Sequence, residues 1–115
     1  MVDFKKKYSF DARCEESKKI KEKYNDRIPI IVTKDKKSKL EDIDKNKFLA
    51  PEDLTIGQFI SIIRKRIMLA DSEAMYIFVN DTLPPTSASL STIYGKHKDE
   101  DGFLYITYCA ENVFG

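Results

Sequence analysis

The chain has 115 residues, of which 42% are hydrophobic and 34% charged, and its formal net charge is +1 at pH 7. This length and composition fit a single globular domain of common size. No apolar stretch reaches the 18 residues expected of a membrane-spanning helix, and the basic N-terminus lacks the apolar core of a signal peptide.

The N-terminal segment is predicted to be helical. We expect a short basic helical turn over residues 3–8. Asp11 is the predicted N-cap of a second helix, because acidic residues follow in its early turns and lysines later. This helix should run to about Tyr24. Its apolar stripe is thin, with Ala12, Ile20 and Tyr24 as members, so we expect the helix to lie on the outside of the domain.

Two strands are predicted next along the chain. The β-branched residues of 27–33 are typical of a strand. Pro29 cannot donate a hydrogen bond to a neighbouring strand, so the start of this strand should lie at an edge or at an end of the sheet. Residues 47–51 form a second, short strand. It carries Lys47 and ends at Pro51, as exposed edge strands often do.

Thr55 is the predicted N-cap of the strongest helix in the chain. Apolar residues follow it at helical spacing and form one continuous stripe. The stripe consists of Ile56, Phe59, Ile60, Ile63 and Ile67. We expect this helix to cover one face of the sheet.

Three further elements complete the predicted fold: a strand over 75–79, a short helix over 89–94 and a last strand over 103–109. The order of elements predicts an α+β fold with a ubiquitin-like β-grasp and an added N-terminal helical segment. We expect a single domain over 1–115. Its parts are N-terminal helices (1–24), a β-grasp core (25–109) and a flexible conjugation tail (110–115).

We find no set of residues that predicts catalysis. A cysteine enzyme needs a thiol, a base and an orienting group. The one histidine, His97, lies between two lysines in a predicted charged turn, Cys14 lies in the outer helix, and Cys109 ends a strand. The two cysteines also lack disulfide or zinc spacing, and no Gly-rich phosphate loop is present. We therefore predict a reduced, cytoplasmic protein that is not an enzyme and needs no metal or cofactor.

The C-terminal residues suit chemistry at the terminal carboxylate. The chain ends in Val113-Phe114-Gly115. Because glycine has no Cβ, its carbonyl can enter a narrow enzyme channel and be attacked there. A terminal glycine also arises by chance, since about 7% of residues are glycine. The terminal glycine therefore supports a role in conjugation only if the rest of the sequence indicates the same function.

Four blocks of sequence resemble the autophagy ubiquitin-like modifiers of the GABARAP type, in the order and spacing of that family. They are Arg27-Ile28-Pro29, Phe59 with Ile63-Arg64-Lys65-Arg66-Ile67, Phe78-Val79-Asn80-Asp81-Thr82-Leu83-Pro84-Pro85, and Asp101-Gly102-Phe103-Leu104-Tyr105. The resemblance covers about Phe4 to Gly115. It implies a ubiquitin-like fold with two N-terminal helices. It also implies attachment of Gly115 to phosphatidylethanolamine and binding of short aromatic-x-x-aliphatic motifs.

The resemblance further implies a set of partners. An activating enzyme would adenylate Gly115 and hold it as a thioester, and a conjugating enzyme would transfer it to the lipid amine. A cysteine protease would process or delipidate the protein. The implied role is autophagosome formation and recruitment of cargo receptors and adaptors that bear the motif. The lipidated form would then lie on autophagosomes and related vesicle membranes.

By the same resemblance, two pockets flank the edge strand. The aromatic-anchor set comprises Glu16, Ile20, Pro29, Ile31, Lys47, Leu49 and Phe103. The aliphatic-anchor set comprises Phe48, Ala50, Pro51, Leu54, Phe59, Ile62 and Arg66. Strand alternation agrees, because it places Lys47 and Leu49 on one side and Phe48 and Ala50 on the other. Exposed edges bind partner strands. The alternative is that these residues are ordinary core, and for Ile31, Phe103 and Leu54 it is about as well supported.

The resemblance also suggests a second surface. The strand over 75–79 is apolar on both faces while one helix can cover only one, so we expect Tyr76 and Phe78 to be partly exposed. The alternative is that the N-terminal helices bury the other face. Three positions depart from the family pattern. Ser9 stands where Pro is frequent, Ala50 replaces a larger aliphatic residue, and Phe48 lacks the hydroxyl of the frequent Tyr.

The charge distribution leaves one alternative of a different class. Basic residues outnumber acidic ones in the first 50 residues, and the reverse holds beyond them. A basic N-terminal half is compatible with tubulin or nucleic-acid binding. A net charge near zero argues against nucleic acid as the main partner. A steep loss of binding with salt would distinguish this class from pocketed peptide binding.

Overall fold

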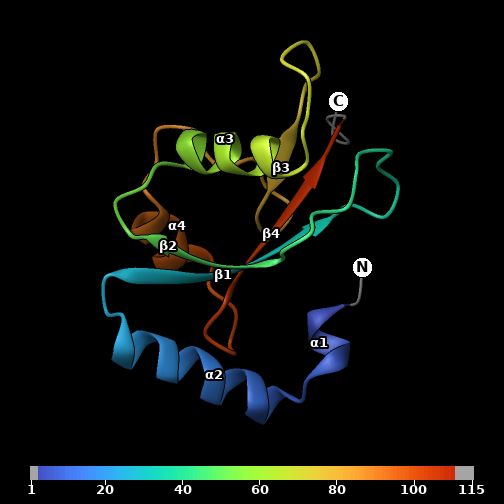
Figure 1. Cartoon of the computed structure of the whole chain (residues 1–115). Helices are drawn as coiled ribbons and strands as arrows, with labels where there is room; N and C mark the ends of the chain where they lie inside the picture. The colour runs from blue at the N-terminus through green and yellow to red at the C-terminus, as the bar shows by residue number, and fades with distance from the viewer. Residues whose placement is uncertain (1–2, 111–115) are drawn as a thin grey trace.

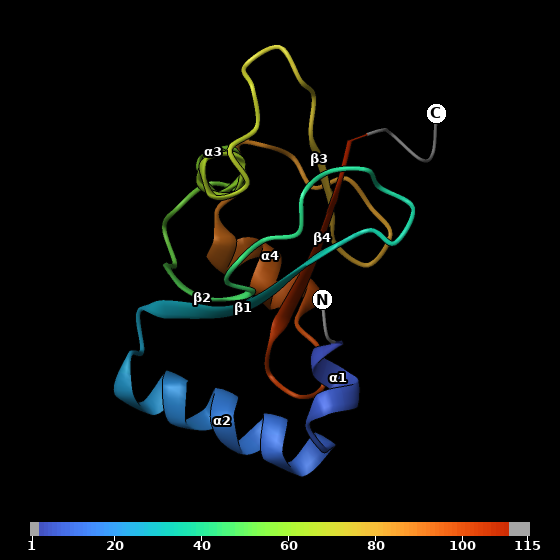
Figure 2. The ribbon, with the colours of Figure 1, turned by 45° about the vertical axis from the view of Figure 1, so that its right-hand side comes forward.

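A computed structural model of the chain describes residues 3–110, which form one mixed four-stranded sheet with helices on both faces (Figures 1 and 2). The elements are α1 (Phe4–Lys7), α2 (Phe10–Lys23), β1 (Arg27–Lys34), β2 (Lys47–Pro51), α3 (Ile56–Arg66), β3 (Tyr76–Phe78), α4 (Leu90–His97) and β4 (Leu104–Cys109). The strand order is β2-β1-β4-β3, with β1 and β4 parallel and the outer pairs antiparallel. The predicted α+β β-grasp is confirmed.

The two faces of the sheet carry separate apolar clusters. The larger cluster faces α3 and joins Ile30 of β1 and Ile106 of β4 to the buried side of that helix. The smaller cluster lies on the side of α1 and α2 and contains Phe4, Ile31 and Phe103. Neighbouring residues of one strand therefore contribute to opposite clusters, as alternation requires.

Helix α3 forms where the apolar stripe predicts it. Thr55 and Gln58 make a capping box, in which each side chain accepts a hydrogen bond from the other residue's backbone N–H. The stripe residues Ile56, Phe59 and Ile63 are fully buried. The predicted cap and core face of this helix are therefore confirmed.

Helix α2 differs from its prediction in two respects. Its N-cap is Ser9, whose Oγ accepts a hydrogen bond from the N–H of Ala12, so the helix begins before Asp11. Its outer position is confirmed, but its inner face is polar. The buried residues are Arg13 and Ser17, whereas Ala12 is exposed and Ile20 is half-buried. Of the predicted apolar stripe, Ile20 packs against the smaller apolar cluster, whereas the most deeply buried residues of the inner face are polar.

The remaining elements follow the predicted order with shifted ends. Strand β3 is shorter than predicted, and α4 continues to His97, so the expected charged turn at His97 is wrong. The side chain of Asn80 contacts Nδ1 of His97 at 3.2 Å and links α4 to the segment after β3. Within residues 3–110, no helix is long and apolar enough to cross a membrane.

Candidate peptide-binding edge

Strand β2 is an edge of the sheet, with β1 as its one neighbour among the described residues. The N–H of Val32 donates a hydrogen bond to the carbonyl of Asn46 at 2.7 Å. Val32 and Asn46 are therefore a hydrogen-bonded pair, and this sets the alternation of bonded and non-bonded pairs along β1 and β2. Because such pairs alternate in an antiparallel ladder, the facing pair of Pro29 and Leu49 is not hydrogen-bonded. The N–H and C=O of Leu49 therefore point toward the open side. Pro29, in turn, removes no bond between β1 and β2.

The position of Pro29 agrees with its prediction. Strand β1 is an inner strand, but its pairing with β4 begins at Ile30. Its first residues therefore have β2 alone as a neighbour, which is the sheet end that a proline tolerates. On the open side, the carbonyl of Leu49 accepts a hydrogen bond from Nη1 of Arg27 at 3.1 Å. A partner strand that pairs with Leu49 would meet this guanidinium.

The predicted aliphatic-anchor set lies between β2 and α3, with a buried floor and an exposed rim. The Phe48 ring meets the Phe59 ring edge-on, with centroids 5.6 Å apart, and both side chains belong to the core. Ile62 is 37% exposed on α3, and Pro51 is exposed at the end of β2. The other members are buried Ala50, half-buried Leu54 and exposed Arg66. The core alternative therefore holds for Phe48 and Phe59, while the rim remains accessible.

Two cations border this set. The guanidinium of Arg66 lies 5.8 Å from the centroid of the Phe48 ring, and Nζ of Lys45 lies 5.7 Å from the same centroid. Arg66 also pairs with Asp44 at 3.8 Å. The cations stand where the acidic flank of a peptide could reach them, beside an apolar floor.

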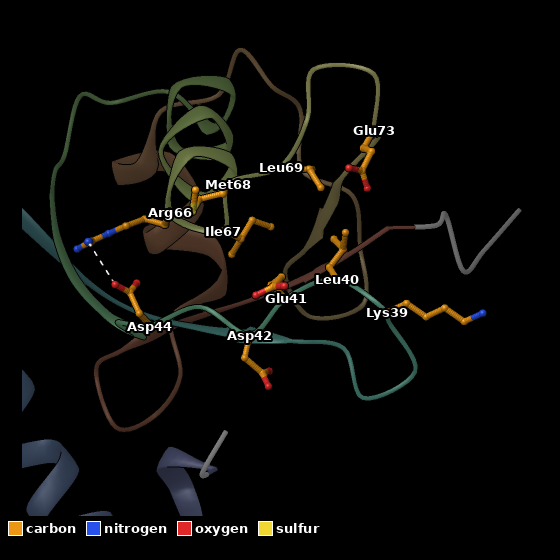
Figure 3. A pocket seen from close by; sticks show the side chains of 10 residues that line it. All are labelled: Lys39, Leu40, Glu41, Asp42, Asp44, Arg66, Ile67, Met68, Leu69 and Glu73. Atoms are coloured by element: carbon orange, nitrogen blue, oxygen red, sulfur yellow. Dashed lines mark ion pairs between the residues drawn. The ribbon is translucent and has the colours of Figure 1, made fainter.

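A separate hollow of about 620 Å³ begins beyond Arg66, between the end of α3 and the segment before β2 (Figure 3). Its charged lining is mainly acidic and comprises Glu41, Asp42, Asp44 and Glu73 against Lys39 and Arg66. The sequence reasoning did not identify this hollow. Its acidic character contrasts with the cations Lys45 and Arg66 beside Phe48.

The predicted aromatic-anchor set is brought together, but its floor is covered. Ile31 and Phe103 are fully buried, as the core alternative had it, and Pro29 is buried beside them. The residue that covers Ile31 and Phe103 is Phe4 of α1, which the sequence reasoning did not include. The sequence feature that could have identified Phe4 is that it is the one aromatic side chain in an otherwise basic turn. The half-buried rim consists of Glu16, Ile20, Lys47 and Leu49.

A buried polar network holds α2 against the start of β4. Asp101 is 1% exposed and accepts hydrogen bonds from Arg13 Nη1 at 2.9 Å and from the Tyr105 hydroxyl at 2.5 Å. Its other carboxylate oxygen accepts the N–H of Phe103 at 2.9 Å. Burial and the hydrogen bond to Asp101 raise the pKa of Tyr105. The network sets the distance between α2 and Phe103, and therefore the width of the aromatic-anchor set.

Gly102 allows the closest approach between α2 and this turn. Its φ is +90°, a conformation that residues with a side chain rarely adopt. A Cβ on Gly102 would lie 2.3 Å from Ser17 Oγ, which donates a hydrogen bond to the Asp101 carbonyl at 2.5 Å. Glycine is therefore required here both by backbone conformation and by space.

Helix α1 is tied to the same region by Lys5. Its Nζ contacts Asp99 Oδ1 at 2.6 Å and lies 4.7 Å from the centroid of the Tyr105 ring. Burial raises the pKa of Asp99, but the hydrogen bond from Lys5, the backbone N–H of Asp101 and the charge of Lys5 outweigh it and lower the pKa overall. Asp99 thus stays ionised and holds α1 in place at neutral pH.

At the predicted second surface, the expected partial exposure holds for Tyr76 and not for Phe78. Tyr76 is half-buried, but Phe78 is 6% exposed, so the expected exposure of Phe78 is wrong. The alternation of β3 remains visible, since Ile77 and Val79 join the cluster under α3 while Phe78 does not. On the far side of the sheet from α3, Phe78 is therefore covered as well.

The reactive side chains of the described segment do not converge. Residues 3–110 contain no group of three or more His, Cys, Asp or Glu side chains that could hold a metal ion. Burial and the nearby Asp101 raise the pKa of the Cys14 thiol, the opposite of what a nucleophilic cysteine needs. The remaining predicted site residue, Gly115, lies outside the described residues.

Comparison with known proteins agrees with this architecture. A family model described as "Autophagy protein Atg8 ubiquitin like" matches residues 12–115. Autophagy-related protein 8 of Vanderwaltozyma polyspora is 57% identical over 112 residues, covering 97% of this chain and 95% of the relative. The protein of the same name from Saccharomyces cerevisiae is 56% identical, covering 97% and 96%.

A solved structure gives the same result for the fold. The crystal structure of Trypanosoma brucei ATG8 superimposes with a TM-score of 0.91 at 43% sequence identity, covering 100% of this chain and 99% of that one. Both the family model and the full-length relatives match nearly the whole chain, so the assignment does not depend on one motif. The chain belongs to the Atg8 family of autophagy ubiquitin-like proteins.

Proposed function

We propose that this protein is conjugated through Gly115 to phosphatidylethanolamine and that the conjugate recruits partners bearing aromatic-x-x-aliphatic motifs to autophagic membranes. The recruiting role rests on the position of β2, which is an open edge strand with residues of one anchor set on each of its two faces. In this role the protein is a substrate and an adaptor, and the catalytic groups belong to its partners.

Strand addition at β2 explains why the motif has this spacing. The outward N–H and C=O of Leu49 supply main-chain hydrogen bonds to an added strand. Lys47 and Leu49 border one face of β2, and Phe48 and Ala50 the other. An aromatic and an aliphatic anchor three residues apart would then enter the two sets, pinned by the strand between them.

Charge supports an acidic flank on the bound motif. Lys45 and Arg66 lie beside Phe48, and Arg27 reaches the carbonyl of Leu49 on the open edge. Each exposed ion pair contributes about 0.2–1 kcal/mol, so these cations adjust the affinity and the register of a peptide bound mainly by its anchors.

Conjugation would attach the protein to a membrane through the lipid. The terminal carboxylate is a poor electrophile and must be activated, first as an adenylate and then as a thioester, before an amine can attack it. The activating and conjugating enzymes would perform these steps, and a cysteine protease would process or delipidate the protein. Two acyl chains of the lipid then give stable anchoring to autophagosomes and related vesicles.

Peptide binding can be tested with variants that leave the core intact. The probe is an acidic-flanked peptide with a Phe-x-x-Leu core, titrated against the ¹⁵N-labelled protein by NMR. We expect shifts along β2, and at least roughly tenfold weaker binding for Leu49→Ala with Ile62→Ala, since each loses an apolar contact. The matched control is Leu83→Ala, an exposed apolar residue outside the site. Equal affinities for all three proteins would contradict the assignment.

A further inference from the structure

Phe4 packs on Ile31 and Phe103, the two fully buried residues of the aromatic-anchor set. It is 5% exposed, although it belongs to a helix of only four residues next to the start of the described chain. Its ring meets that of Phe103 edge-on, with centroids 5.2 Å apart and an interplanar angle of 72°. With Ile31 it completes the smaller apolar cluster. The floor of the aromatic-anchor set is therefore already filled by an aromatic ring.

An ion pair joins two residues on the rim of the set. Lys47 of β2 forms an ion pair with Glu16 of α2, and the paired oxygen of Glu16 is shielded from solvent. Nζ of Lys47 also lies 5.7 Å from the centroid of the Phe4 ring. Two residues of the predicted set thus contact each other and one of them contacts Phe4. An aromatic anchor from a partner has no access to Phe103 in this arrangement.

Apart from the Phe4 ring, the contacts that hold α1 against the domain are partly exposed to solvent. Beyond Phe4, the helix is held by Lys5, whose side chain is 46% exposed and pairs with Asp99. The next aromatic residue, Tyr8, meets Phe4 with ring centroids 5.1 Å apart and an interplanar angle of 55°, but is 39% exposed. One buried ring and one partly exposed ion pair can be exchanged for a partner's ring and its ion pairs.

We propose that Phe4 is a built-in occupant of the aromatic-anchor pocket, and that a motif-bearing partner binds by displacing it. This inference rests on the proposed function, because it concerns regulation of the same site. The closed form is the one described here. The open form has α1 released, the Glu16–Lys47 pair parted and Ile31 and Phe103 free to receive the partner's aromatic anchor.

The observed affinity for a peptide then equals the intrinsic affinity of the open form multiplied by the fraction of molecules that are open. Any change that loosens α1 without touching the pocket residues should tighten peptide binding. A change in the pocket itself should weaken it. The direction of the change in affinity therefore distinguishes two roles for Phe4. Loss of an intramolecular competitor would tighten peptide binding, whereas loss of a residue that only lines the pocket would weaken it.

Displacement can be observed directly, because the chain contains no tryptophan. Phe4→Trp places a single indole in the closed pocket, and its emission should be blue-shifted in the free protein. Titration with the tryptophan-free Phe-x-x-Leu peptide should move the emission toward the value of a solvated indole. A peptide with Ala-x-x-Ala at the core positions is the control and should leave the emission unchanged.

Affinity provides the second readout. Phe4→Ala should bind the peptide roughly fivefold tighter or more, and Lys5→Ala should shift affinity in the same direction by less, since the ring remains. Phe10→Ala removes an aromatic residue of the same N-terminal segment that is 46% exposed, and should bind like the parent protein. Retained far-UV circular dichroism and amide dispersion of the β-grasp show that the variants are folded.

The outcomes separate this inference from the proposed function. Peptide binding at β2 with unchanged Phe4→Trp emission, or weaker binding by Phe4→Ala, would overturn the displacement of Phe4 and leave motif binding intact. Binding by Phe4→Ala alone, with none by the parent protein, would support a strongly closed pocket. Absence of binding by every folded variant would overturn both.

Discussion

Replacing Asp101 by Asn tests whether the buried network, rather than apolar contact, holds α2 on the sheet. Asp101 is 1% exposed and its partner Arg13 is 8% exposed, so the pair lies almost entirely out of water. Asn has nearly the same shape and retains an oxygen for the N–H of Phe103. The change therefore removes the negative charge and leaves the guanidinium buried without its partner.

Breaking a buried pair in this way costs about 3–5 kcal/mol. Because Asn keeps part of the hydrogen bonding, we expect the lower end, about 3 kcal/mol, for the free energy of unfolding. For a domain of this size that loss corresponds to a fall in Tm of roughly 10–15 °C. Ile20 of α2 packs against the smaller apolar cluster but is only half-buried, so this contact should compensate for little of the loss.

The assay is urea unfolding followed by circular dichroism and tyrosine fluorescence, with Asp99→Asn as the matched control. Asp99 carries a partly exposed pair with Lys5, so its replacement should cost under about 1 kcal/mol. The double variant of Asp101→Asn with Arg13→Met should recover part of the loss, since the unpaired charge is gone. If Asp101→Asn and Asp99→Asn unfold at the same urea concentration, the reasoning about the network is wrong.

Two further perturbations address the close packing of the fold. Gly102→Ala should reduce the free energy of unfolding by at least about 2 kcal/mol, because the backbone has φ of +90° and the new Cβ would overlap Ser17 Oγ; a loss under about 0.5 kcal/mol in urea unfolding would contradict this. Burial and nearby Asp42 raise the pKa of Tyr108 to about 12, so its contribution is complete below its unfolded pKa of about 10 and is lost as pH rises through 12. Tyr108→Phe should flatten the decline of stability between these pH values, and an unchanged alkaline profile would refute the assignment.

Local signals in the sequence were sufficient for most of the fold. Thr55 followed by an apolar stripe predicted both the cap and the buried face of α3. Lys47 and Pro51 marked β2 as an edge, and alternation within it placed Phe48 and Leu49 on the correct sides. These features depend on neighbours in the chain, so a single sequence displays them.

The errors arose where long-range contacts decide. Arg13 faces inward because Asp101, 88 residues away, accepts its hydrogen bond, and no pattern within α2 indicates this partner. Phe4 is buried by Phe103 at the other end of the chain, so the composition of its basic turn concealed its role. Phe78 is covered on a face that β3 alone suggested would be open.

The central claim, that this Atg8-family protein is a modifier joined to a lipid through Gly115, is tested most directly by reconstitution. The reaction contains the protein, activating and conjugating enzymes of a related system, ATP and liposomes with phosphatidylethanolamine. We expect a product of altered gel mobility that floats with the liposomes and is absent for Gly115→Ala, although that variant remains folded. Equal conjugation of Gly115→Ala, or no conjugate from enzymes that are active on their own modifier, would contradict the claim.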